Sequence, residues 1–150
     1  FQHGHTYIGH ATACAAALAV QQVIEREGLL QRVDQLGIEL RRALAARFDE
    51  HPHIGDIRGR GLFLGLEFVA DRASKKPFPT EDRFDQVLKS AAMEQGLICY
   101  PMAGTIDGKN GSHVLLAPPF ILSDDQIGEI VDKLALAVDV TVASAAGRRT

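Results

Sequence analysis

Residues 54–69 have the sequence Ile-Gly-Asp-Ile-Arg-Gly-Arg-Gly-Leu-Phe-Leu-Gly-Leu-Glu-Phe-Val. This stretch predicts two short strands, 54–58 and 62–69, joined by a tight turn at Gly59-Arg60-Gly61. Successive side chains of a strand point to opposite faces of its sheet. In the second strand we therefore expect one face to hold Leu62, Leu64, Leu66 and Phe68, and the other to hold Phe63, Gly65, Glu67 and Val69.

Two helices are predicted before these strands. The first covers 10–27, is rich in alanine and stops at Gly28, a residue type common just after helix ends. Its small side chains favour close packing, so we expect it in an interior or an interface. The second covers 29–48, where large apolar residues recur at helical spacing and charged residues occupy the opposite face.

Helices and strands also alternate after the two strands. Thr80, followed by two acidic residues, is expected to cap a helix that ends at Gly96. Two strands, 97–100 and 112–117, flank a turn at 107–111 that contains three residues typical of turns. Ser123 and Gln126 have the spacing of a capping box and open a last helix, and the tail 144–150 is expected to fray.

This element order predicts an α/β (α+β) fold: a small, mostly antiparallel sheet covered by helices and preceded by two long helices. The chain has 150 residues, with 46% hydrophobic and 23% charged residues and a net charge of −3. These values are ordinary for a globular protein and argue against binding to nucleic acid or to an anionic membrane. Cys14 and Cys99 both lie in apolar runs, so we expect them to be reduced and buried in a cytoplasmic protein.

The first ten residues, Phe-Gln-His-Gly-His-Thr-Tyr-Ile-Gly-His, form the densest group of polar and aromatic side chains. A glycine-flanked loop before a helix can hold phosphate, because free N–H groups and the helix dipole favour an anion there. Thr6 would add a hydroxyl donor. The alternative is a plain loop with exposed histidines.

Other motifs favour structural roles. The histidine pairs His3/His5 and His51/His53 lack nearby ligands that would complete a metal site, so no metal is predicted. The Gly59–Gly61 turn precedes a strand instead of a helix, which argues against a dinucleotide site, and Arg58 and Arg60 are expected to pair with acidic neighbours. None of the lysines looks catalytic, because all occupy polar settings: Lys75, Lys76, Lys89, Lys109 and Lys133.

Several blocks of the sequence, in order, resemble the C-terminal portion of class III aminotransferases, pyridoxal-phosphate enzymes of fold type I. The first block is His-Gly-His-Thr-Tyr-Ile-Gly-His at 3–10, ahead of the alanine-rich helix. Further blocks occupy 24–30, 55–62, 64–67, 96–98 and 117–120.

The resemblance implies that the parent protein transfers an amino group between an amine or amino acid and a keto acid. It implies that Thr6 reaches the phosphate of pyridoxal 5'-phosphate across the interface of a homodimer, with His5 and Tyr7 beside it. The Schiff-base lysine is expected upstream of this chain, so no catalytic residue is assigned here and the chain alone is expected to be inactive. Family members often carry a carboxylate-binding arginine where this chain has Tyr100 or Leu115, and Tyr100 is assigned to the substrate pocket.

On this basis 1–28 would be the end of the large cofactor-binding domain, 29–143 the connecting helix and small C-terminal domain, and 144–150 a frayed tail. An alternative is a non-catalytic binding or oligomerisation module derived from the same fold, associating through the exposed alanine-rich helix.

Overall fold

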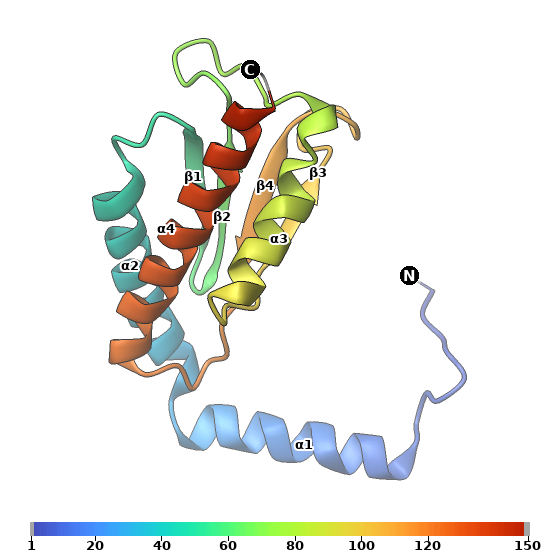
Figure 1. Ribbon diagram of the computed structural model, residues 1–150. Helices are drawn as coiled ribbons and strands as arrows, with labels where there is room; N and C mark the ends of the chain where they lie inside the picture. The colour runs from blue at the N-terminus through green and yellow to red at the C-terminus, as the bar shows by residue number, and fades with distance from the viewer. Residues whose placement is uncertain (1, 149–150) are drawn as a thin grey trace.

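The computed structural model describes residues 2–148 (Figure 1). Phe1, Arg149 and Thr150 lie outside the described residues, and so do the parts of the predicted loop and tail that fall on them. In chain order, the elements are α1 (Ala11–Arg26), α2 (Leu29–Phe48), β1 (Ile54–Arg60), β2 (Phe63–Phe68), a 3₁₀ helix (Thr80–Asp82), α3 (Phe84–Glu94), β3 (Tyr100–Ala103), β4 (Ser112–Leu116) and α4 (Asp124–Gly147).

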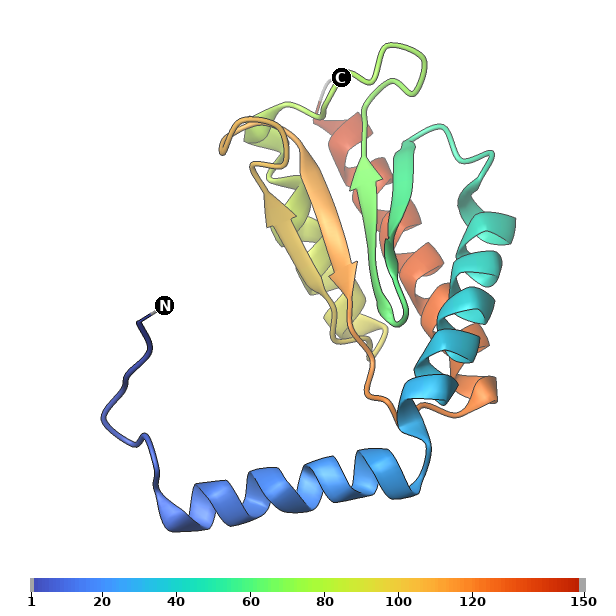
Figure 2. The ribbon, with the colours of Figure 1, turned by 180° about the vertical axis from the view of Figure 1, so that it is seen from behind.

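The four strands form one antiparallel sheet in the order β1-β2-β4-β3. Helices α2, α3 and α4 lie against one face of it (Figure 1), and Figure 2 shows the opposite face with no helix of the described chain over it. Pro101 lacks a backbone N–H, but it is tolerated in β3 because this strand lies at the edge of the sheet. The predicted fold class, a small antiparallel sheet covered by helices, is confirmed.

The core lies between the sheet and the three helices. Alternate residues of β2 and β4 are buried on the helix side, as the period of the sequence predicts. From α2 the core receives a stripe of residues at intervals of four: Leu36, Leu40, Leu44 and Phe48. From the strands it receives Leu64, Leu66, Phe68, Val114 and Leu116, each at most 3% exposed.

Helix α1 stands apart from this core (Figures 1 and 2). Gly28, in the left-handed region at φ 61°, ends α1 as predicted and also caps α2. No residue of α1 is buried, and apolar side chains such as Leu18 and Val20 are more than half exposed. We expected this helix in an interior or an interface, but the described chain does not cover it. The apolar surface of α1 therefore stays exposed.

Two predicted element starts are wrong, each for a local reason. After α3, Gly96 at φ 71° and the bond from the Leu97 N–H to the Ala92 carbonyl wrap the chain around the helix end, burying Leu97. This C-cap uses the residues expected to begin a strand, so β3 begins at Tyr100 instead of Leu97. Thr80 caps no α-helix: it starts the 3₁₀ turn, and Arg83 precedes α3.

The last helix runs further than predicted. Its capping box at Ser123 and Gln126 is confirmed, but α4 continues through 144–147, where fraying was expected. Ala145 is buried, and the Arg148 guanidinium donates to the Asp82 carbonyl over 2.8 Å. These tertiary contacts thus stabilise the C-terminal end of α4, which the local sequence alone would leave to fray.

The cysteines differ from their predicted burial. Cys14 is exposed on α1, because nothing in the described chain covers that helix, and Cys99 is half-buried just before β3. Burial raises the pKa of the Cys99 thiol to about 11.

We predict that a thiol reagent at pH 8 modifies Cys14 at least about tenfold faster than Cys99, because thiolate is the reactive form and a thiol of such high pKa supplies very little of it. The rates are measured by mass spectrometry of peptides from the folded chain. Cys14→Ser should remove the fast phase and leave the slow one, and equal rates at the two sites would contradict the structure.

Candidate functional site

The N-terminal loop forms a turn over 6–9 that leads into α1. The Ile8 N–H donates to the His5 carbonyl over 3.0 Å, and the His10 N–H donates to the Tyr7 carbonyl over 3.1 Å. His10 caps α1, its Nδ1 accepting the Ala13 N–H at 3.4 Å. This capping role was missed from the sequence, because histidine is not among the preferred N-cap residues.

Thr6 occupies the start of this turn with its side chain exposed. Among residues 2–148, no acceptor is found for the Thr6 hydroxyl or for the N–H groups of Thr6 and Tyr7. Exposed donors of this kind, next to a helix N-terminus, are suited to an anion. The binding of phosphate by this loop stays a prediction.

Aromatic and imidazole rings surround the turn. The rings of His3 and His5 meet edge to face at 5.5 Å, and those of Tyr7 and His10 do so at 6.0 Å. His5 and Tyr7 flank Thr6, as the sequence requires, and both are exposed. Within the described residues no group of three potential metal ligands is found.

The open face of the sheet brings together two positions on the consecutive strands β3 and β4. Tyr100 of β3 and Leu115 of β4 are cross-strand partners, and Gly65 of β2 and Arg58 of β1 continue the same row. The two places where the resemblance expects an arginine are therefore one place on the sheet. This place carries the phenol ring of Tyr100 and the side chain of Leu115, next to Gly65.

Arg58, at the far end of this row, is held by two carboxylates. Its Nη1 lies 2.9 Å from Asp56 Oδ2 and 2.6 Å from Glu67 Oε2, as predicted for Arg58, whereas among the described residues no ion pair is found for Arg60. Hydrogen bonds to Asp56 and Glu67 raise the pKa of Arg58. Because its charge is already matched by two carboxylates, Arg58 does not supply the missing guanidinium.

His113 lies in the next row, opposite Glu67 and Met102. Its Nδ1 is 2.8 Å from the Thr105 hydroxyl. Burial, and then the charge of Arg58, lowers the pKa of His113. Charged and polar groups thus gather on β1, β2 and the far end of β4, away from Tyr100.

The structure does not bring Thr6 and Tyr100 together. In both ribbon views the N-terminal segment stands at the far end of α1, apart from the strands. The lysines do not converge on either group: Lys75, Lys76, Lys89 and Lys109 are exposed, and Lys133 pairs with Glu129 at 2.6 Å. Among the described residues, no helix is long and apolar enough to cross a membrane.

Both groups of residues lie within a single family match. The family model for class III aminotransferases matches residues 1–138. The chain belongs to the class III aminotransferase family.

The family includes close relatives of this chain. An uncharacterised aminotransferase of Schizosaccharomyces pombe is 47% identical over 139 residues, which are 93% of this chain and 30% of the relative. A diaminobutyrate–2-oxoglutarate transaminase of Halomonas elongata is 36% identical over 137 residues, 91% of this chain and 28% of the relative. The chain thus spans about 30% of the length of the aminotransferases it matches.

Solved aminotransferases share the fold. An aminotransferase mutant of Vibrio fluvialis, solved with PLP bound, superposes with a TM-score of 0.84 at 37% identity over 97% of this chain and 30% of that one. An (S)-enantioselective omega-transaminase of Thermomicrobium roseum gives a TM-score of 0.81 at 32% identity over 95% of this chain and 30% of that one. The expectation that this sheet and its helices form part of a fold type I enzyme is confirmed.

Proposed function

We propose that this chain is the C-terminal part of a class III aminotransferase. The parent would transfer an amino group between an amine or amino acid and a keto acid. The observation that carries the proposal is the family match over 1–138, which includes both the Thr6 loop and the Tyr100–Leu115 pair. The relative from Schizosaccharomyces pombe is about three times longer than the part that matches this chain.

Pyridoxal 5'-phosphate is the proposed cofactor, and the donor set of the N-terminal loop fits its phosphate. Thr6 would donate its hydroxyl and backbone N–H to the phosphate oxygens, and the exposed rings of His5 and Tyr7 would line the pocket on either side. Bound pyridoxal phosphate would supply the electron sink for amino-group transfer.

The loop lies far from the open face of the sheet in the same chain. We therefore propose that Thr6 serves the cofactor across the interface of a homodimer. The exposed apolar side chains of α1 support this, because such a surface is usually covered in the native assembly.

The lysine that carries the cofactor is proposed to come from another part of the parent. Such lysines are usually desolvated or held next to another cation. Four lysines of this chain are exposed, and Lys133 is neutralised by Glu129. This part of the enzyme would thus supply the phosphate contact and one wall of the substrate pocket.

Tyr100 is the proposed substrate contact on that wall. The place that it shares with Leu115 offers aromatic and aliphatic surface and no guanidinium. A carboxylate is bound best by the two parallel donors of an arginine. The wall therefore favours the apolar part of an amine over a carboxylate.

We predict that Tyr100→Arg in the full-length enzyme changes substrate preference toward carboxylates. The ratio of kcat/KM for an amino acid to kcat/KM for the matching amine without the carboxylate should rise about tenfold or more, because a charge-assisted pair contributes roughly 1.5–3 kcal/mol. Steady-state assays with purified holoenzyme measure the ratio. Leu115→Arg should act in the same direction, because it places the charge at the same point of the sheet.

Ile98→Arg is the matched control, since Ile98 is 86% exposed and lies outside the strand. It should leave the ratio unchanged. If neither Tyr100→Arg nor Leu115→Arg moves the ratio, Tyr100 does not face the substrate. If the wild-type holoenzyme transfers no amino group at all, the proposed function itself is wrong.

A further inference from the structure

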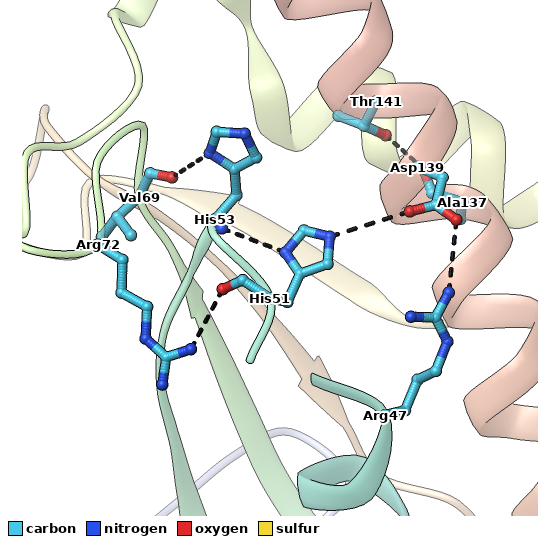
Figure 3. A network of polar contacts seen from close by, with 8 residues as sticks. All are labelled: Arg47, His51, His53, Val69, Arg72, Ala137, Asp139 and Thr141. Carbon is cyan, nitrogen blue, oxygen red and sulfur yellow. Dashed lines mark hydrogen bonds and ion pairs between the residues drawn. The ribbon is translucent and has the colours of Figure 1, made fainter. Parts of the chain in front are cut away.

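His51 sits at the centre of a polar network that joins four parts of the fold (Figure 3). Its ring lies in the connection between α2 and β1, with the side chain only 12% exposed. Nδ1 accepts the N–H of His53 at 3.2 Å, and Nε2 lies 3.9 Å from Asp139 Oδ1 on α4. Asp139 also pairs with Arg47, near the end of α2, at 3.5 Å.

These contacts determine which ring nitrogen carries the hydrogen. An N–H can donate only to an unprotonated nitrogen, so Nδ1 of His51 is bare and the hydrogen of the neutral ring is on Nε2. That hydrogen faces the Asp139 carboxylate. The bond to the His53 N–H therefore exists only while His51 is neutral.

His53 in turn contacts Val69, the residue directly after β2. Its Nδ1 lies 3.1 Å from the Val69 carbonyl, and its own carbonyl accepts the Val69 N–H at 2.9 Å. The His53 ring also packs on Phe78, which is 5% exposed and stacks on Phe84 in the core. Arg72 donates to the carbonyls of Asp49 and His51.

We propose that His51 is a proton-operated latch, which fastens the α2–β1 connection to the end of β2 when neutral and releases it when protonated. A proton would bind the lone pair of Nδ1 and leave two donors, Nδ1–H and the His53 N–H, facing one another. Neither ring orientation gives an imidazolium a free acceptor nitrogen for His53. The loop 70–77, anchored through Val69 and Arg72, would then loosen.

The charges around the ring favour the neutral form overall. Burial lowers the pKa of His51 from its ordinary value of 6.5, and the nearby His53, Arg47 and Arg72 lower it further. Asp139 acts in the opposite direction. Because the pKa is lower in the folded state than in the unfolded state, the contribution of His51 to stability is complete above pH 6.5 and is lost as the pH falls below that value.

Two measurements on the full 150-residue chain test the latch. In an NMR titration, the His51 ring should titrate below pH 6.5. In amide hydrogen exchange, corrected for intrinsic rates, protection of the His53 and Val69 amides should fall severalfold between pH 7.5 and pH 5, because a protonated ring no longer accepts the His53 N–H.

His51→Asn separates the latch from other effects of acid. The side-chain oxygen of asparagine can still accept a nearby N–H but does not titrate, so protection of the His53 amide should no longer depend on pH. His113→Asn is the matched control: His113 also has a lowered pKa but lies on the open face of the sheet, and this variant should keep the wild-type pH dependence.

Two results would overturn the proposal. One is a His51 ring that titrates at or above pH 6.5. The other is an equal loss of protection in acid for wild type and His51→Asn. If His51→Asn is too unstable to study, the two measurements on the wild-type chain still test the proposal. Protection of the His53 amide must then fall over the same pH range in which the His51 ring is protonated.

Discussion

Replacing Thr6 by alanine in the full-length aminotransferase is expected to weaken the binding of pyridoxal phosphate by about tenfold to a hundredfold, since a hydrogen bond to a charged group contributes roughly 1.5–3 kcal/mol. The Thr6 side chain is exposed at the turn before α1, and within 2–148 no other group uses its hydroxyl. Its removal should therefore cost the proposed phosphate contact without disturbing a core. Fluorescence titration of the apoenzyme with the cofactor measures the change.

Two comparisons make the Thr6 experiment specific. Thr6→Ser keeps the hydroxyl and should stay close to wild type, whereas Thr12→Ala, an exposed threonine of α1 at 11–26, should have no effect. Pyridoxal, which lacks the phosphate, should bind wild type and Thr6→Ala equally. If Thr6→Ala weakens pyridoxal and pyridoxal phosphate alike, Thr6 acts on the shape of the pocket and not on the phosphate.

Gly59→Ala is expected to destabilise the chain by about 2–5 kcal/mol, a large share of the 5–15 kcal/mol that holds most domains together. Gly59 has φ 140° and lies opposite Leu64 in the β1–β2 pair. A Cβ there would stand 2.1 Å from the Phe63 carbonyl oxygen and 2.8 Å from the Leu64 Cα. Backbone atoms cannot move aside as a flexible side chain can, so the hairpin itself would have to deform.

Gly128→Ala serves as the control for this substitution. Gly128 is exposed inside α4, and a Cβ there meets nothing within 4 Å. Alanine is the better helix former, so this variant should be more stable by about 0.5–1 kcal/mol. Urea unfolding of both variants gives the two free energies, and a Gly59→Ala chain within about 0.5 kcal/mol of wild type would contradict the geometry of this hairpin.

The candidate site was found from the sequence only through motifs. Thr6, His5, Tyr7 and Tyr100 came from blocks that resemble class III aminotransferases, and the family match confirms that resemblance. Their roles toward cofactor and substrate stay predictions. Composition and spacing alone led no further than a loop able to hold an anion, because single hydroxyls and histidines are common in exposed loops.

Local sequence determined which kind of element each segment forms. The alternation of apolar residues from Leu62 to Phe68 determined a strand with one buried face, and the stripe from Leu36 to Phe48 determined a helix. Gly28 and the Ser123–Gln126 capping box determined helix boundaries. These features depend on neighbours within about four residues, so their physical cause is present in the sequence itself.

Only the tertiary structure decided what lies beside what. It placed β4 between β2 and β3, so that the Tyr100–Leu115 pair lies beside Gly65, and it brought His51 next to Asp139, which is 88 residues further along the chain. It also extended α4 through the contact of Arg148 with Asp82 and left Cys14 exposed. Such contacts depend on the packing of whole helices and strands, and the spacing of residues along the chain carries no direct record of that packing.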